Sequence, residues 1–220
     1  SAIDNKIGWL ENDGNENFSD HTVTSSNNLL AVHAADLNGD GYMDIISYSA
    51  ADDAINWYRN NGSESFTALT IKTDIDITLE IIAEDMDGDG DIDVVSASTW
   101  EKETAWYEND GTGIFTYRPI NSNIDEAPYD VYATDMDGDG DIDVISALTT
   151  ADKITWYEND GNKNFTENLV SDTAAQANSV YAADLDGDGD IDVLSTLAGD
   201  NSVVWYENDG SEIFTSHIIT

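Results

Sequence analysis

Four short segments of the 220-residue chain carry acidic side chains at a spacing that would hold a metal ion. Each follows the pattern D-x-[DN]-x-D-G-x-x-D, which places side-chain oxygens at positions 1, 3, 5 and 9 around a glycine at position 6. Carboxylates held this close repel one another unless a cation lies between them. Oxygen ligands in this number, with the backbone carbonyl at position 7, suit Ca²⁺ better than Mg²⁺ or Zn²⁺. The pattern therefore predicts about four calcium sites.

The predicted ligands are the side chains at positions 1, 3, 5 and 9 and the carbonyl at position 7 of each segment. In the first segment they are Asp36, Asn38, Asp40 and Asp44, with the carbonyl of Tyr42. In the second they are Asp85, Asp87, Asp89 and Asp93, with the carbonyl of Asp91. In the third they are Asp135, Asp137, Asp139 and Asp143, with the carbonyl of Asp141. In the fourth they are Asp184, Asp186, Asp188 and Asp192, with the carbonyl of Asp190.

The first segment differs from the others in charge. With Asn38 and Tyr42 in place of aspartates it carries three charges, against five in each of the other three. We expect it to bind calcium most weakly. An EF-hand is the nearest alternative, but it requires flanking helices and a glutamate at position 12, where all four segments have serine. A solvated acidic loop without an ion is the other alternative, and four copies in register disfavour it.

The acidic segments belong to a longer repeat. Their first aspartates are spaced by 49, 50 and 49 residues, and a tryptophan follows each of them after 21 residues. The repeated tryptophans are Trp9, Trp57, Trp106, Trp156 and Trp205, and a phenylalanine comes nine residues after each. This strict register favours packing in a core over sugar binding. Trp100 is the one tryptophan outside the register, and a sugar ring could stack on it, although a packed surface position is the alternative we favour.

Alternating or short apolar runs predict four strands in each repeat. The first two flank the acidic segment, for example 79–83 and 93–97, and the last two are joined by an Asn-Asp-Gly type of turn. Four antiparallel strands in about 49 residues, repeated head to tail, are typical of a β-propeller blade. We predict an all-β chain with a half blade over 1–24 and full blades over 29–72, 79–121, 129–170 and 178–220.

A half blade leaves an unpaired sheet edge, so these repeats are not expected to close into a ring alone. Two interpretations remain open. The chain is part of a longer ring or array, or another chain supplies the two missing strands. In the second case the half blade would be exchanged between molecules and would build a polymer.

Composition limits the classes of partner. The formal net charge of −39 argues against nucleic acid and anionic membrane surfaces, and no apolar run is long enough for a membrane span. The absence of cysteine excludes disulfides, thiolate metal sites and thiol nucleophiles. With 40% hydrophobic residues, the chain can nevertheless build a core.

The four acidic segments, with the Asp-[IV]-[ILV]-Ser strands that follow them, resemble the FG-GAP/VCBS repeats, which are similar to the blades of the integrin α-subunit propeller. The resemblance covers nearly the whole chain. It implies a β-propeller, usually of seven blades, in which calcium holds the loop between the first two strands of a blade. It also implies a role in adhesion, in sugar binding or as an accessory domain of a polysaccharide-degrading enzyme.

No residues outside the repeat form a catalytic motif. His21, His33 and His217 follow no metal-binding spacing, and a structural or solvent-facing role is expected for each. We therefore expect a non-catalytic, calcium-stabilised module that acts outside the cell in adhesion, recognition or assembly. Calcium loops of the extracellular kind bind at about 10⁻⁴ to 10⁻³ M, which suffices where calcium is millimolar. The alternatives are a lectin-like carbohydrate-binding domain and an accessory domain of a polysaccharide-active enzyme.

Overall fold

The computed structural model describes residues 5–25, 28–121 and 125–220. Within these residues the chain forms eighteen strands, and the one helical element is a 3-10 turn, η1 (Thr149–Ala151). None of the described helical segments is long and apolar enough to cross a membrane. The prediction of an all-β chain is confirmed.

The strands pair into one two-stranded and four four-stranded antiparallel sheets, each in chain order. The N-terminal hairpin consists of β1 (Lys6–Asn12) and β2 (Phe18–Ser25). The first sheet contains β3 (Leu29–Ala35), β4 (Asp44–Ser49), β5 (Ala54–Asn60) and β6 (Phe66–Thr73). The second contains β7 (Thr78–Glu84), β8 (Asp93–Ser98), β9 (Glu103–Asn109) and β10 (Phe115–Asn121). The third contains β11 (Pro128–Thr134), β12 (Asp143–Leu148), β13 (Lys153–Asn159) and β14 (Phe165–Ser171). The fourth contains β15 (Ala177–Ala183), β16 (Asp192–Leu197), β17 (Ser202–Asn208) and β18 (Phe214–Ile218).

The second strand of each sheet is the most deeply placed. β4, β8 and β12 are buried at every residue, because they lie in the middle of a sheet that is covered on both faces. In each of these strands the first aspartate is followed by two residues of valine or isoleucine, types that favour strands. The predicted strands over 79–83 and 93–97 agree with β7 and β8 to within one residue at each end.

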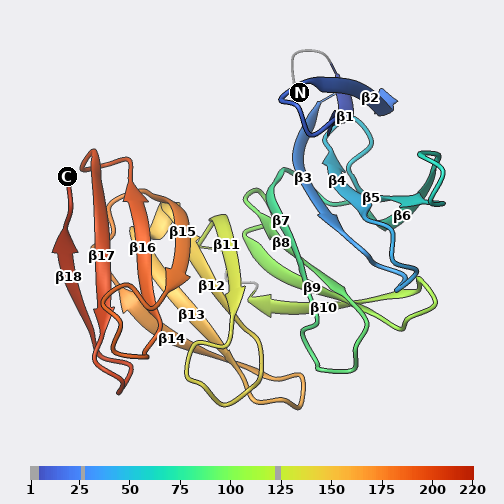
Figure 1. Cartoon of the computed structure of the whole chain (residues 1–220). Coiled ribbons are helices and arrows are strands. Elements are labelled where there is room, and N and C mark those ends of the chain that lie inside the picture. Colours follow the sequence, from blue (N-terminus) through green and yellow to red (C-terminus); the bar gives the residue numbers. More distant parts are fainter. Residues whose placement is uncertain (1–4, 26–27, 122–124) are drawn as a thin grey trace.

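The four-stranded sheets follow one another along an arc (Figure 1). The first strands of successive sheets contact each other, β3 with β7, β7 with β11 and β11 with β15. The N-terminal hairpin and the fourth sheet lie apart, at the two ends of the arc (Figure 1). The arrangement is therefore propeller-like, with the first strand of each sheet on the inner side.

Tryptophans of the repeat fill the space between neighbouring sheets. Trp106 of β9 is fully buried and meets Phe165 of the third sheet edge to face, with ring centroids 6.2 Å apart. Trp57 and Phe115 form the same contact between the first two sheets. Trp156 is also fully buried. The predicted core role of these three tryptophans is confirmed.

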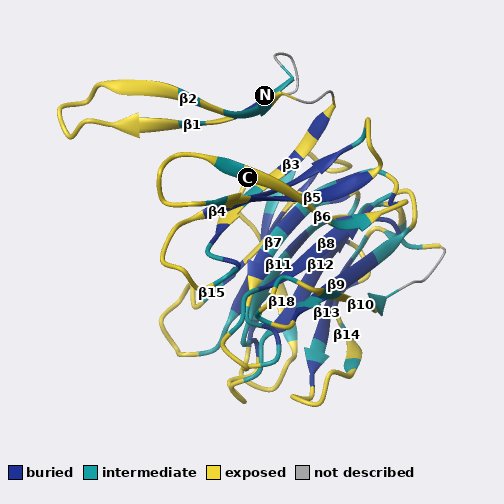
Figure 2. Cartoon of the chain, turned by 90° about the vertical axis from the view of Figure 1, so that its right-hand side faces the viewer, coloured by how far each residue is buried: buried dark blue, intermediate teal, exposed yellow. Residues whose placement is uncertain are grey.

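The equivalent tryptophans at the two ends of the arc, Trp9 and Trp205, are only half-buried. Trp9 stacks on His21 of the same hairpin, with centroids 4.2 Å apart, and Trp205 lies 4.8 Å from His217. The hairpin packs through Ile7 on the first sheet, next to Leu29. Figure 2 shows that the rest of the hairpin extends away from the sheets and is largely exposed.

Candidate metal centre

Each acidic segment is the loop that joins the first strand of a sheet to the second. We call them the first loop (36–44), the second loop (85–93), the third loop (135–143) and the fourth loop (184–192). The tight path of each loop depends on two glycines with left-handed backbone, such as Gly88 with φ of 71° and Gly90 with φ of 95° in the second loop. The loops therefore lie at one end of the strands, and the last aspartate of each begins the second strand.

The aspartate at position 9 is buried and ties the loop to the sheet. Oδ1 of Asp93 accepts a hydrogen bond from the backbone N–H of Asn109, 2.7 Å away, and Oδ2 accepts one from Met86, 3.1 Å away. Asp143 and Asp192 make the equivalent pairs of bonds. In the first loop, Oδ1 of Asp44 accepts from the backbone N–H of Asn60, 2.7 Å away, and Oδ2 accepts from the indole Nε1 of Trp57, 2.8 Å away. This residue therefore has a structural role besides the predicted ligation.

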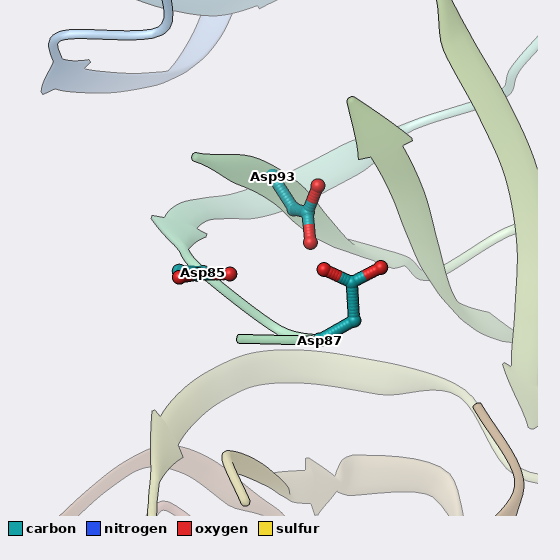
Figure 3. Close-up of side chains that lie close together, drawn as sticks. All are labelled: Asp85, Asp87 and Asp93. Carbon is teal, nitrogen blue, oxygen red and sulfur yellow. The ribbon is translucent and has the colours of Figure 1, made fainter. Parts of the chain in front are cut away.

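The aspartates at positions 1, 3 and 9 converge in three of the four loops. In each case one carboxylate oxygen of each residue lies within 4.8 Å of the others. The converging residues are Asp85, Asp87 and Asp93 in the second loop, Asp135, Asp137 and Asp143 in the third, and Asp184, Asp186 and Asp192 in the fourth. Figure 3 shows the second cluster, in which Asp87 and Asp93 point toward each other from the loop and from β8.

Two oxygens of the second cluster are buried without a hydrogen-bond partner. These are Oδ1 of Asp85 and Oδ1 of Asp87, and the side chain of Asp87 is only 5% exposed. A buried carboxylate oxygen that accepts no hydrogen bond is costly unless a cation binds it. The atoms that could bind a metal ion are all hard carboxylate oxygens, which suit calcium and do not suit a soft metal.

Burial also acts on the protonation of these clusters. It raises the pKa of Asp93 to about 7 and that of Asp143 to about 6. Burial raises the pKa of Asp137 as well, despite the hydrogen bond from the backbone of Asp139. A divalent cation would favour the ionised form of each group and would reverse this effect.

The aspartates at position 5 lie outside the three clusters. Asp89, Asp139 and Asp188 each accept a hydrogen bond from the backbone N–H two residues later, at 2.9 to 3.0 Å. These bonds close the turn. Ligation by these residues, and by the carbonyls at position 7, stays a prediction.

The side chains at position 7 have a neighbour that the sequence did not reveal. Asp91, Asp141 and Asp190 lie directly over the glycines of the turn between the third and fourth strands, namely Gly111, Gly161 and Gly210. A Cβ on Gly161 would come within 2.4 Å of Oδ2 of Asp141. Tyr42 covers Gly62 in the same way. The glycine of the Asn-Asp-Gly turn thus serves the acidic loop as well as the turn.

The first loop has a different internal arrangement. The side-chain amide of Asn38 donates to Oδ2 of Asp40, 2.9 Å away, and an aspartate at the position of Asn38 has no such donor when it is ionised. The side-chain amide of Asn38 therefore already occupies a carboxylate oxygen of the first loop that could otherwise bind an ion. Among the described residues, the clusters of three acidic groups lie in the other three loops. This agrees with the expectation that the first site is the weakest, which stays a prediction.

The remaining candidates lie away from the clusters. Trp100 is 70% exposed, in the turn between β8 and β9. His21 pairs with Glu11 at 3.0 Å and His217 with Glu207 at 2.6 Å. His33 is half-buried on β3, and burial lowers its pKa.

Known structures with the same arrangement of sheets are similar over nearly the whole chain. A lectin of Agrocybe aegerita with specific recognition of non-reducing terminal N-acetylglucosamine matches 99% of the chain, with a TM-score of 0.69 and 22% identity. A functionally unknown protein of Desulfotomaculum acetoxidans matches all of it, with a TM-score of 0.68 and 12% identity. Virginiamycin B lyase of Staphylococcus aureus also matches all of it, with a TM-score of 0.64 and 14% identity. The chain spans 61% of the lectin and 64% of each of the other two, and at these identities the likeness concerns the fold.

Sequence comparison adds a family. No curated protein matches the chain significantly. The model of the FG-GAP-like repeat matches residues 1–47, 85–146 and 135–195, which together cover more than half of the chain and include all four acidic loops. The chain therefore belongs to the FG-GAP-like repeat family.

Proposed function

We propose that this chain forms blades of a calcium-stabilised, non-catalytic β-propeller module that acts in recognition outside the cell. The observation that carries the proposal is the pair of buried, unpartnered oxygens of Asp85 and Asp87 inside a cluster that recurs in two further loops. Because the clusters repeat in register with the scaffold, their role is structural. Calcium bound at each would hold the first strand to the second, and its binding free energy would add to that of folding.

The test is thermal unfolding with and without calcium. We expect millimolar calcium to raise the melting temperature strongly relative to excess chelator. The variant Asp139→Ala is expected to reduce this rise without abolishing the fold, since it removes a predicted ligand from one loop only. Asp209→Ala, in an exposed turn, is the matched control and should keep the full calcium effect. A melting temperature that does not respond to chelator would refute the proposal.

Carbohydrate recognition is the second candidate. It is supported by the similarity of the fold to a lectin that recognises N-acetylglucosamine and by the exposed ring of Trp100. Tryptophan fluorescence can be titrated with N-acetylglucosamine and screened against a glycan array. In a lectin that uses this ring, Trp100→Ala loses binding while the melting temperature is unchanged. A chain that binds no glycan on the array would leave protein recognition or assembly as the function.

Assembly through the hairpin is a third candidate. The hairpin β1–β2 corresponds to the last two strands of a sheet, and a cavity of about 340 Å³ lies beside it, lined by Trp9, Met43 and Phe66. Two strands from another molecule could complete this sheet. Light scattering across a range of concentrations tests the idea, because a strict monomer with bound calcium would exclude it.

A further inference from the structure

The second, third and fourth loops carry the same aspartates, yet the second and third lie in opposite electrostatic surroundings. At the last two sheet junctions, the turn between the third and fourth strands of one sheet reaches the loop of the sheet before it. The turn residue that lies against the loop has a left-handed backbone conformation, and its residue type differs between the two junctions. It is Lys163 opposite the second loop and Glu212 opposite the third.

Lys163 lies directly against the second cluster. Its Nζ is 2.7 Å from Oδ2 of Asp87, and it also contacts Glu108 of β9. Glu108 is held from the other side by Arg118. The second cluster therefore has an ammonium group in contact and a guanidinium group close by, and the ammonium group helps to bury Asp87.

The third cluster has the reverse arrangement. Glu212 lines the same cavity of about 380 Å³ as Asp135 and Asp137, and Asp137 is exposed where Asp87 is covered. Glu158 is the residue of the third sheet that corresponds to Glu108. It accepts a hydrogen bond from the neutral side-chain amide of Asn168, 3.0 Å away. The third loop thus faces an additional carboxylate.

We propose that Lys163 is a built-in cation that lowers the calcium affinity of the second loop, so that calcium fills the third loop before the second. This rests on the proposed calcium function and refines it. Near Asp87, a divalent ion is repelled by the ammonium group and competes with it for the same carboxylate. Among the described residues, no lysine or arginine forms an ion pair with an aspartate of the third loop, and the negative charge of Glu212 attracts the ion.

Calcium titration in competition with a chromophoric chelator separates the binding steps. Relative to the unaltered chain, Lys163→Gln is expected to raise the calcium affinity of one binding step about tenfold. Removal of a partly screened charge produces an effect of this size. Lys163→Arg keeps the charge and should leave the curve unchanged. Lys153→Gln is the matched control, because Lys153 pairs with Glu126 and Glu167 away from the loops.

The rise in melting temperature on adding calcium gives a second readout, which a merely structural role of Lys163 would leave unchanged. Lys163→Gln leaves Asp87 without its cation, so we expect a lower melting temperature in chelator and a larger rise on adding calcium. The tightened step should also vanish when Lys163→Gln is combined with Asp87→Ala, since the second loop is then disabled.

The outcomes separate the two proposals. If the unaltered chain binds calcium but Lys163→Gln changes no step, or changes it as much as Lys153→Gln does, the role of Lys163 is refuted and the calcium function stands. If neither the unaltered chain nor Lys163→Gln binds calcium, the calcium function itself fails, and the role of Lys163 fails with it.

Discussion

The side-chain amide of Asn159 donates a hydrogen bond to the backbone carbonyl of Met86, 2.9 Å away in the neighbouring sheet. Asn159 stands at the end of β13, and Met86 is the second residue of the second loop. The same amide also donates to Ile142 within its own sheet at 3.1 Å. Asn109 makes the equivalent bond to Leu37 of the first loop, at 2.8 Å. At the first two junctions between four-stranded sheets, one asparagine therefore connects the acidic loop of one sheet to the next sheet.

Asn159→Ala is expected to destabilise the chain by about 2–3 kcal/mol, because it removes the donor for two buried carbonyls. Urea unfolding followed by tryptophan fluorescence measures the change. Asn164→Ala is the control, because it loses side-chain hydrogen bonds only within an exposed turn. It should lower the free energy of unfolding by less than about 1 kcal/mol. Equal losses in the two variants would show that the bond between sheets contributes little.

Gly161→Ala is expected to weaken calcium binding at the third loop several-fold. The new methyl group would lie 2.4 Å from Oδ2 of Asp141 and would displace the residue whose carbonyl is a predicted ligand. Gly14→Ala is a matched control, since Gly14 has a similar φ of 79° and no atom within 4 Å of its added Cβ. Both variants bear the same backbone strain. A calcium titration in which both behave alike would contradict a link between the turn and the loop.

A pH dependence is expected from Glu80, which is half-buried on β7. Burial, together with the charge of Asp130 on β11, raises the pKa of Glu80 to about 7. A raised pKa means that the folded state favours the neutral acid. Its stabilising contribution is present below the unfolded pKa of about 4.3 and is lost as the pH rises through about 7.

Between pH 5 and 8 the free energy of unfolding of Glu80→Gln should therefore fall less than that of the unaltered chain. The expected difference is about 1–3 kcal/mol. Urea unfolding in chelator at several pH values measures this difference. Glu16→Gln removes a carboxylate from the exposed turn of the hairpin and serves as the control. Parallel pH profiles for Glu80→Gln and the unaltered chain would exclude the burial of a charged Glu80 as the cause.

Much of the fold could be predicted from the sequence, because each repeat has its own local signals. The run Asp93-Val-Val-Ser has no polar alternation, which indicates a strand covered on both faces, and β8 is such a strand. The constant distance from each acidic segment to its tryptophan indicated one common scaffold. Burial of Trp106 against the next sheet follows from that register.

The surroundings of the clusters could not be predicted in this way. Lys163 and Asp87 are 76 residues apart, and no local pattern states which sheet a turn will face. Likewise, the spacing predicts four side-chain ligands per loop, whereas Asp89 turns back to its own backbone and only three aspartates converge. Contacts between repeats depend on how the sheets are placed, and the period alone does not determine that placement.

Calcium binding by the loops can be tested with a crystal structure of the chain grown in millimolar calcium, in which anomalous scattering locates the ions. We predict an ion among Asp85, Asp87 and Asp93, with equivalent ions in the third and fourth loops. Clusters without anomalous signal at saturating calcium, with Asp85 and Asp87 bonded to each other or to water instead, would contradict it.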